Sequence, residues 1–94
     1  MSKMELPSRL IPSEGIVAQK LDNEIVLLDL NSSQYLGLNE VGARVWTLIN
    51  EGRELDAIKS MLTQEYDVEA AALAADVDAL IRSMIDVGIV VAEG

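Results

Sequence analysis

Hydrophobic and polar positions in the first half of the chain follow the pattern of three successive strands. Residues 16–21, 24–30 and 34–38 are short runs rich in aliphatic residues, and the middle run is largely apolar on both of its faces. Between the runs, residues 22–23 and 31–33 consist of Asp, Asn and Ser, which favour tight turns. The pattern therefore predicts a three-stranded antiparallel meander whose middle strand is covered on both sides.

Beyond the third run the apolar positions recur every three to four residues, which indicates helices. A first helix is expected to begin after Asn39, a favourable N-cap residue, and to end at Gly52. Trp46 flanks its apolar stripe and is expected in the core. A second helix is expected from about Leu55 to Tyr66.

The third and longest helix is expected from about Val68 to Val87, with Asp67 as its N-cap and Gly88 as its stop. Residues 89–91 then form a brief extended tail that could pair with the sheet. Strands followed by helices give an α+β domain rather than a doubly wound one.

The 94 residues suit a single domain. Residues 1–14 contain two Pro and three Ser without periodicity, and they are predicted to form a flexible N-terminal arm or a strap that becomes ordered on docking. Residues 15–94 are predicted to form the α+β domain, with a three-stranded antiparallel sheet followed by three helices.

The composition removes most catalytic and metal chemistry. The chain contains no Cys and no His, so disulfides, thiol nucleophiles and zinc fingers are excluded. It also lacks a glycine-rich phosphate loop. Glu65 and Asp67 could be imagined as a carboxylate pair, but acids at a helix end are usually solvated. We therefore expect a protein that is not an enzyme and that uses no cofactor or metal.

Sixteen acidic residues face seven basic residues, which gives a formal net charge of −9. Nucleic-acid backbones repel such a surface, so the charge argues against a nucleic-acid partner. It serves solubility or steers a basic partner. No apolar run approaches the about 20 residues of a membrane span, and residues 1–12 lack the apolar block of a signal peptide. We expect a soluble, cytoplasmic protein.

The third predicted strand lies at an edge of the meander. It consists of Gln34, Tyr35, Leu36, Gly37 and Leu38 and has neither charge nor Pro, two features that commonly protect an edge from pairing. Gly37 would let another backbone approach closely. Two interpretations stay open: the chain's own termini cover this edge, or a partner adds a strand to it.

The third predicted helix has an apolar arc wider than docking on a core requires. One flank could line a groove beside the edge strand, where a peptide would find backbone hydrogen bonds on one side and side-chain pockets on the other. The alternative is a long helix buried on a broad front. Asp76 lies at the edge of the arc, where it could meet a base or a backbone N–H of a partner. The arc consists of Leu73, Ala74, Val77, Leu80, Ile81, Met84, Ile85 and Val87.

The segment between Tyr35 and Trp46 resembles the signature of the PqqD-like family, a strand ending in tyrosine and then the pattern LNxxGxxIW. The resemblance covers roughly residues 16–92. It implies a winged helix-turn-helix-like fold that binds the leader segment of a ribosomally made precursor peptide, as an extra strand in a cleft against the third helix. With Asp76 included, the candidate peptide-binding residues are Gln34, Tyr35, Leu36, Gly37, Leu38, Asp76, Val77, Leu80, Ile81 and Met84.

The resemblance also implies the partners: a precursor peptide and an enzyme that processes it, such as the leader peptidase of lasso-peptide biosynthesis. Within the family, the alternative is a pyrroloquinoline quinone precursor-peptide chaperone that serves a radical enzyme. Outside the family, two alternatives stay open. One is a winged-helix DNA-binding regulator, although the third helix is acidic. The other is a dimerisation module that pairs edge to edge. We expect a monomer or a weak homodimer.

Overall fold

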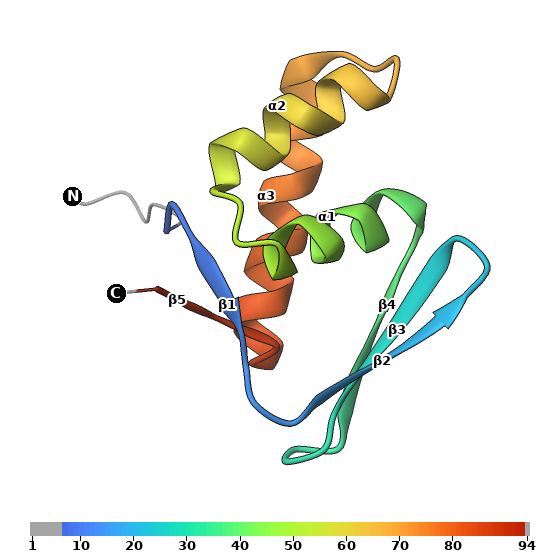
Figure 1. Ribbon diagram of the computed structural model, residues 1–94, viewed down its shortest axis with the longest axis vertical. Helices are drawn as coiled ribbons and strands as arrows, with labels where there is room; N and C mark the ends of the chain where they lie inside the picture. The colour runs from blue at the N-terminus through green and yellow to red at the C-terminus, as the bar shows by residue number, and fades with distance from the viewer. Residues whose placement is uncertain (1–6, 94) are drawn as a thin grey trace.

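The computed structural model describes residues 7–93 of the chain. Five strands and three helices follow one another in these residues (Figure 1). In chain order they are β1 (Leu10–Pro12), β2 (Ile16–Leu21), β3 (Glu24–Asp29), β4 (Gln34–Leu38), α1 (Glu40–Asn50), α2 (Leu55–Glu65), α3 (Ala70–Val87) and β5 (Val90–Ala92). The predicted α+β class, with a three-stranded antiparallel sheet followed by three helices, is confirmed.

Strands β2, β3 and β4 form the predicted meander, with antiparallel pairing throughout and β3 in the middle. Asp22 and Ser33 hold the two turns with φ angles of +56° and +62°. Short polar residues tolerate this left-handed conformation better than bulky ones do. Asp29 is buried where β3 ends, and its carboxylate accepts a hydrogen bond of 2.9 Å from the backbone N–H of Asn31.

The expectation that the middle strand is covered on both sides is wrong. Ile25 and Leu27 of β3 are buried, whereas Val26 and Leu28 point to the opposite face and are only half-buried. The helices lie to one side of the sheet (Figure 1). Among the described residues no layer covers the outer face, where Tyr35 lies opposite Leu28 and is 73 % exposed.

The N-caps of the helices differ in how well the sequence predicts them. Asn39 caps α1 as predicted, because its side-chain oxygen accepts a hydrogen bond of 2.9 Å from the backbone N–H of Gly42. The cap expected at Asp67 is wrong: the N-cap of α3 is Glu69, without a side-chain hydrogen bond. The backbone N–H of Val68 instead bonds to the carbonyl of Tyr66, and this tight turn delays the helix to Ala70.

The C-terminal tail forms a strand, but it does not join the main sheet. β5 pairs with β1 in a separate two-stranded sheet. Ser13 fastens this pair to the end of α3, since its N–H and its hydroxyl donate to the carbonyls of Ile89 and Gly88 at 2.8 and 2.6 Å. Burial of Leu10 and Val90 accounts for the pairing, because each strand brings one aliphatic side chain into the core.

Part of the segment expected to be a flexible arm is therefore a strand. Leu10, within that segment, is 3 % exposed, and the backbone N–H of Leu55 bonds to the carbonyl of Ser8 at 2.7 Å. Residues 1–6 of the expected arm lie outside the described residues.

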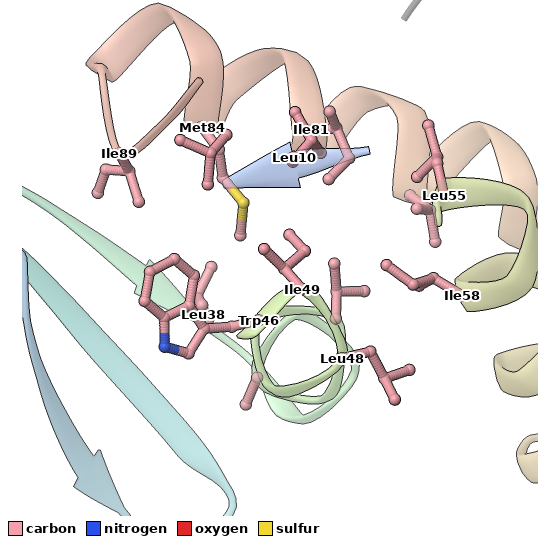
Figure 2. Close-up of a cluster of buried hydrophobic side chains, with 14 of the residues drawn as sticks. Leu10, Leu38, Trp46, Leu48, Ile49, Leu55, Ile58, Ile81, Met84 and Ile89 are labelled. Atoms are coloured by element: carbon pink, nitrogen blue, oxygen red, sulfur yellow. The ribbon is translucent and has the colours of Figure 1, made fainter. Parts of the chain in front are cut away.

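The core lies between the sheet and the helices. Figure 2 shows Met84 pointing from α3 toward Trp46 and Ile49 of α1, with Leu10 of β1 nearby. Trp46 is buried, as predicted. The stripe of α3 that enters the core consists of Leu73, Val77, Ile81 and Met84. In the described part of the chain, no helix has the length and apolar character needed to cross a membrane.

A comparison of Gly88 with Gly37 tests whether the end of α3 needs a residue in the left-handed conformation. Gly88 has a φ of +90°, whereas Gly37 has no such φ, and a Cβ at either position would meet no atom within 4 Å. We expect Gly88→Ala to lower the free energy of unfolding by about 1–2 kcal/mol, because an L side chain disfavours this conformation. Gly37→Ala should not lower it and should raise it by up to about 1 kcal/mol, because Ala loses less backbone entropy than Gly in a strand. Urea unfolding followed by circular dichroism measures both, and equal losses would contradict this explanation.

Candidate functional site

The outer edge of β4 has no strand partner among residues 7–93. The order of the main sheet is β2-β3-β4, so β4 pairs on one side only. The two strands nearest the termini pair with each other. The interpretation that the tail at residues 89–91 covers this edge is therefore wrong, because those residues are used at β1.

A cleft of about 500 Å³ opens where β4 meets the helices. Its walls come from the end of β4, the first half of α1, the loop before α3 and one flank of α3. The lining residues are Gly37, Leu38, Asn39, Val41, Gly42, Val45, Tyr66, Val68, Ala72, Leu73, Asp76, Val77 and Leu80.

Gly42 lets the two sides of this cleft come close together. A Cβ at this position would lie 3.3 Å from Cβ of Leu38 and 3.3 Å from Cδ2 of Leu80. Both distances are shorter than ordinary carbon contacts. Because Gly42 has no side chain, α1 packs near β4 and α3 at the same point. The glycine of the sequence signature thus has a structural reason.

The structure brings half of the predicted peptide-binding residues to the cleft. Gly37, Leu38, Asp76, Val77 and Leu80 line it. The remaining residues of β4 lie along the same free edge without lining the cleft: Leu36 is half-buried, and Gln34 and Tyr35 are exposed. Backbone pairing along the whole of β4 stays a prediction.

Ile81 and Met84, which were expected to contact a bound peptide, lie in the core. Both are 0 % exposed, they belong to the core, and they do not line the cleft. Figure 2 shows both side chains among the core residues that face α1. The reason is the helical phase, because the core stripe of α3 is centred on Val77, Ile81 and Met84, so the flank that faces the cleft carries Asp76 and Leu80.

Other lining residues were not among the predicted peptide-binding residues. Val41 and Val45 belong to the apolar stripe of α1, and Leu73 belongs to that of α3, so periodicity alone assigned them to a core. Tyr66 and Val68 lie between two helices. Val68 was expected to begin the third helix. It lies before α3 instead, is 49 % exposed and lines the cleft, and no sequence pattern pointed to this role.

Two polar contacts join α1 to the end of α2 and to Tyr66 beside the cleft. Arg44 donates two hydrogen bonds of 2.9 and 2.8 Å to the carboxylate of Glu65. This bidentate contact lowers the pKa of Glu65 and raises the pKa of Arg44. The hydroxyl of Tyr66 donates to Glu40 at 3.4 Å. Burial raises the pKa of Tyr66, and the carboxylate of Glu40 adds to the rise, so the phenol stays protonated.

The contact with Arg44 argues against a catalytic carboxylate pair of Glu65 and Asp67. Glu65 is engaged by Arg44 and therefore lacks the raised pKa that a general acid needs near neutral pH. Within residues 7–93, no group of three Asp or Glu side chains is placed to hold a metal ion. The arrangement offers an apolar cleft and a free strand edge.

Two solved structures are similar to this chain over most of its length. "TbiB1 in Complex with the TbiA(beta) Leader Peptide" matches with a TM-score of 0.81 and 28 % sequence identity, covering 89 % of this chain and 98 % of that chain. "Lasso peptide synthetase B1 complexed with the leader peptide" matches with a TM-score of 0.79 and 27 % identity, covering 89 % of this chain and 99 % of that chain. No curated protein gives a significant match.

A protein family also matches, and it spans the cleft. The family described as "Coenzyme PQQ synthesis protein D (PqqD)" matches residues 24–90, which run from the start of β3 to the start of β5. The matched span contains β4, all three helices and every residue that lines the cleft. The chain therefore belongs to the PqqD family.

Proposed function

We propose that this chain is an adaptor that binds the leader segment of a ribosomally made precursor peptide by β-strand addition to β4. The observation that carries the proposal is the free edge of β4 beside an apolar cleft. A guest strand satisfies its backbone hydrogen bonds along such an edge and buries alternate side chains in such a cleft.

The two structural neighbours support this proposal. Each is a complex with a leader peptide, and each matches this chain over nearly the full length of the neighbour. One of the two neighbours is a lasso peptide synthetase B1. We therefore favour lasso-peptide biosynthesis as the pathway, and the pyrroloquinoline quinone precursor-peptide chaperone remains the alternative within the family.

The register of the sheet predicts how a guest strand would be oriented. Leu36 lies opposite the buried Leu27, so these two residues share the face toward the helices. Guest side chains opposite Leu36 and Leu38 would therefore point to the face of the sheet on which the helices and the cleft lie. Guest residues opposite Tyr35 and Gly37 would lie on the outer face, where a processing enzyme could contact them.

The proposed role is presentation without catalysis. The chain contains neither Cys nor His, and Glu65 is engaged by Arg44. We propose that a separate maturation enzyme, such as a leader peptidase, acts on the bound precursor in the cytoplasm, where ribosomal peptides are made. A DNA-binding role has weaker support, because α3 carries Asp76, Asp78 and Asp86 against Arg82 alone.

Proline substitutions at two neighbouring positions of β4 test the pairing. In an antiparallel strand, successive N–H groups point to opposite edges, so one of Leu36→Pro and Gly37→Pro removes a donor to the guest and the other removes a donor to β3. We expect the variant with the smaller loss of thermal stability to bind leader peptides at least about 10-fold more weakly than the unchanged protein, from the lost bond and the ring clash.

Fluorescence polarisation measures this binding, with leader segments from short precursor reading frames encoded beside the gene and with the TbiA(beta) leader as a reference. Circular dichroism reports the fold of each variant. Unchanged affinity in a proline variant that keeps its thermal stability would exclude the N–H of that residue as a donor to the guest, and unchanged affinity in both variants would exclude β4 as the pairing strand.

Leu80 tests the cleft. It is half-buried and lines the cleft, whereas the neighbouring Ala79 is exposed on α3 and does not line it. Leu80→Asp should weaken peptide binding by about 10- to 100-fold, the loss expected when about 1.5–3 kcal/mol of apolar burial is removed. Ala79→Asp makes the same change in charge outside the cleft and should leave affinity nearly unchanged. Titration of both variants with the same peptides compares them, and equal affinities would place the apolar anchor elsewhere.

A further inference from the structure

The cleft has one charged side chain among its lining residues in the described part of the chain, and that side chain is Asp76. Asp76 is exposed at the rim of an otherwise largely apolar lining. Among residues 7–93, no salt bridge involves it. Its carboxylate is therefore available to a bound peptide.

The next acid on α3 shows the contrast. Asp78 forms an ion pair of 2.7 Å with Lys59 of α2, which lies away from the cleft lining. Lys59 thus balances the charge of Asp78, whereas Asp76, two residues earlier, is left open toward the cleft.

Most of the described basic side chains are already paired within the protein. Arg9, Arg44, Arg53 and Lys59 each lie within 4 Å of a carboxylate oxygen. The described bases outside these pairs are Lys20 on β2 and Arg82 on α3, and neither lines the cleft.

The acids around the cleft are in surplus by comparison. Asp67 and Glu69 flank the lining residue Val68 and are both exposed. Glu40 lies beside the lining residue Tyr66, which donates to it at 3.4 Å. With a net charge of −9 over the whole chain, the rim of the cleft therefore attracts cations and repels acidic segments.

From this arrangement we infer that the bound peptide is basic, and that Asp76 selects Lys or Arg at a guest position facing α3. The inference rests on the proposed function, which supplies the strand pairing. A Lys or Arg side chain suits the site because its aliphatic stem packs on apolar groups such as Leu80 while its charged end meets the carboxylate.

The alternation of a strand predicts the sequence pattern of this guest. Side chains that enter the cleft are two residues apart, because residues between them point to the outer face. The guest should therefore carry an apolar anchor at one position, i, and a basic residue on the same face at i+2 or i−2, or at another even offset from the anchor.

Selection from a random peptide library displayed on phage tests the inference without knowledge of the natural precursor. Peptides are selected on the unchanged protein, on Asp76→Lys and on Asp86→Lys. Asp86 is exposed on α3 and does not line the cleft, so its variant makes the same change in net charge away from the site. On the unchanged protein and on Asp86→Lys, we expect the selected peptides to be enriched in Lys or Arg at one position of the guest strand. On Asp76→Lys, we expect Asp or Glu at that position instead.

Binding of one selected basic peptide gives the size of the effect. We expect about 10-fold weaker binding to Asp76→Lys than to Asp86→Lys, since a reversed charge exchanges attraction for repulsion. The difference should shrink as salt rises, because the screening length falls from about 10 Å at 0.1 M to about 3 Å at 1 M.

The outcomes separate this inference from the function on which it rests. Apolar peptides that bind without a basic preference, and that lose affinity to Leu80→Asp, would overturn the charge selection and leave strand addition intact. Equal loss of basic preference in Asp76→Lys and Asp86→Lys would reduce the effect to net charge and would also overturn the role of Asp76. Selected peptides that bind both proline variants of β4 unchanged, or a selection that enriches none, would overturn both.

Discussion

The pairing of β1 with β5 is the constraint on which the proposed site depends. Either strand could have covered the free edge of β4, since both are short and apolar. Leu10 and Val90 are instead buried in the core, and Ser13 bonds to the carbonyls of Gly88 and Ile89 at the end of α3. These contacts commit both strands to each other, and the edge of β4 stays available because the described terminal strands are used elsewhere.

Helix α3 has two functions, core packing and lining the cleft, and Leu73 and Val77 take part in both. One stripe, which includes Ile81 and Met84, is fully buried against α1 and fixes the helix in place. The adjacent flank, with Asp76 and Leu80, faces the cleft. Gly42 of α1 connects the two functions, since its missing side chain lets Leu38 and Leu80 approach the same point. A rigid core stripe thus positions a flank that is left free to bind.

The sequence predicted the order and bounds of the main elements well because their signals are local. The alternation of apolar and polar residues, the turn residues and the cap at Asn39 each determine the structure of residues that are close to them in the chain. The partner of β5 could not be read in this way, since it depends on a strand far away in the chain. The sequence did not separate Ile81 and Met84 from the residues that line the cleft, because a wide apolar arc does not reveal which part faces the core and which faces a cleft. The start of α3 moved to Ala70 because the turn at Tyr66 and Val68 competes with Asp67 as a cap.

An apolar strand edge without charge or proline exposes a protein to pairing with its own copies. β4 has neither protection among Gln34 to Leu38, so its surroundings must supply it. Two copies that met edge to edge along β4 would bring their acidic cleft rims together, and each copy carries a net charge of −9. Like charges oppose this contact, whereas a basic strand lowers the repulsion as it binds. The same surplus of acid therefore disfavours self-pairing and favours a guest of opposite charge, which allows an edge that would otherwise be a liability to remain open for binding.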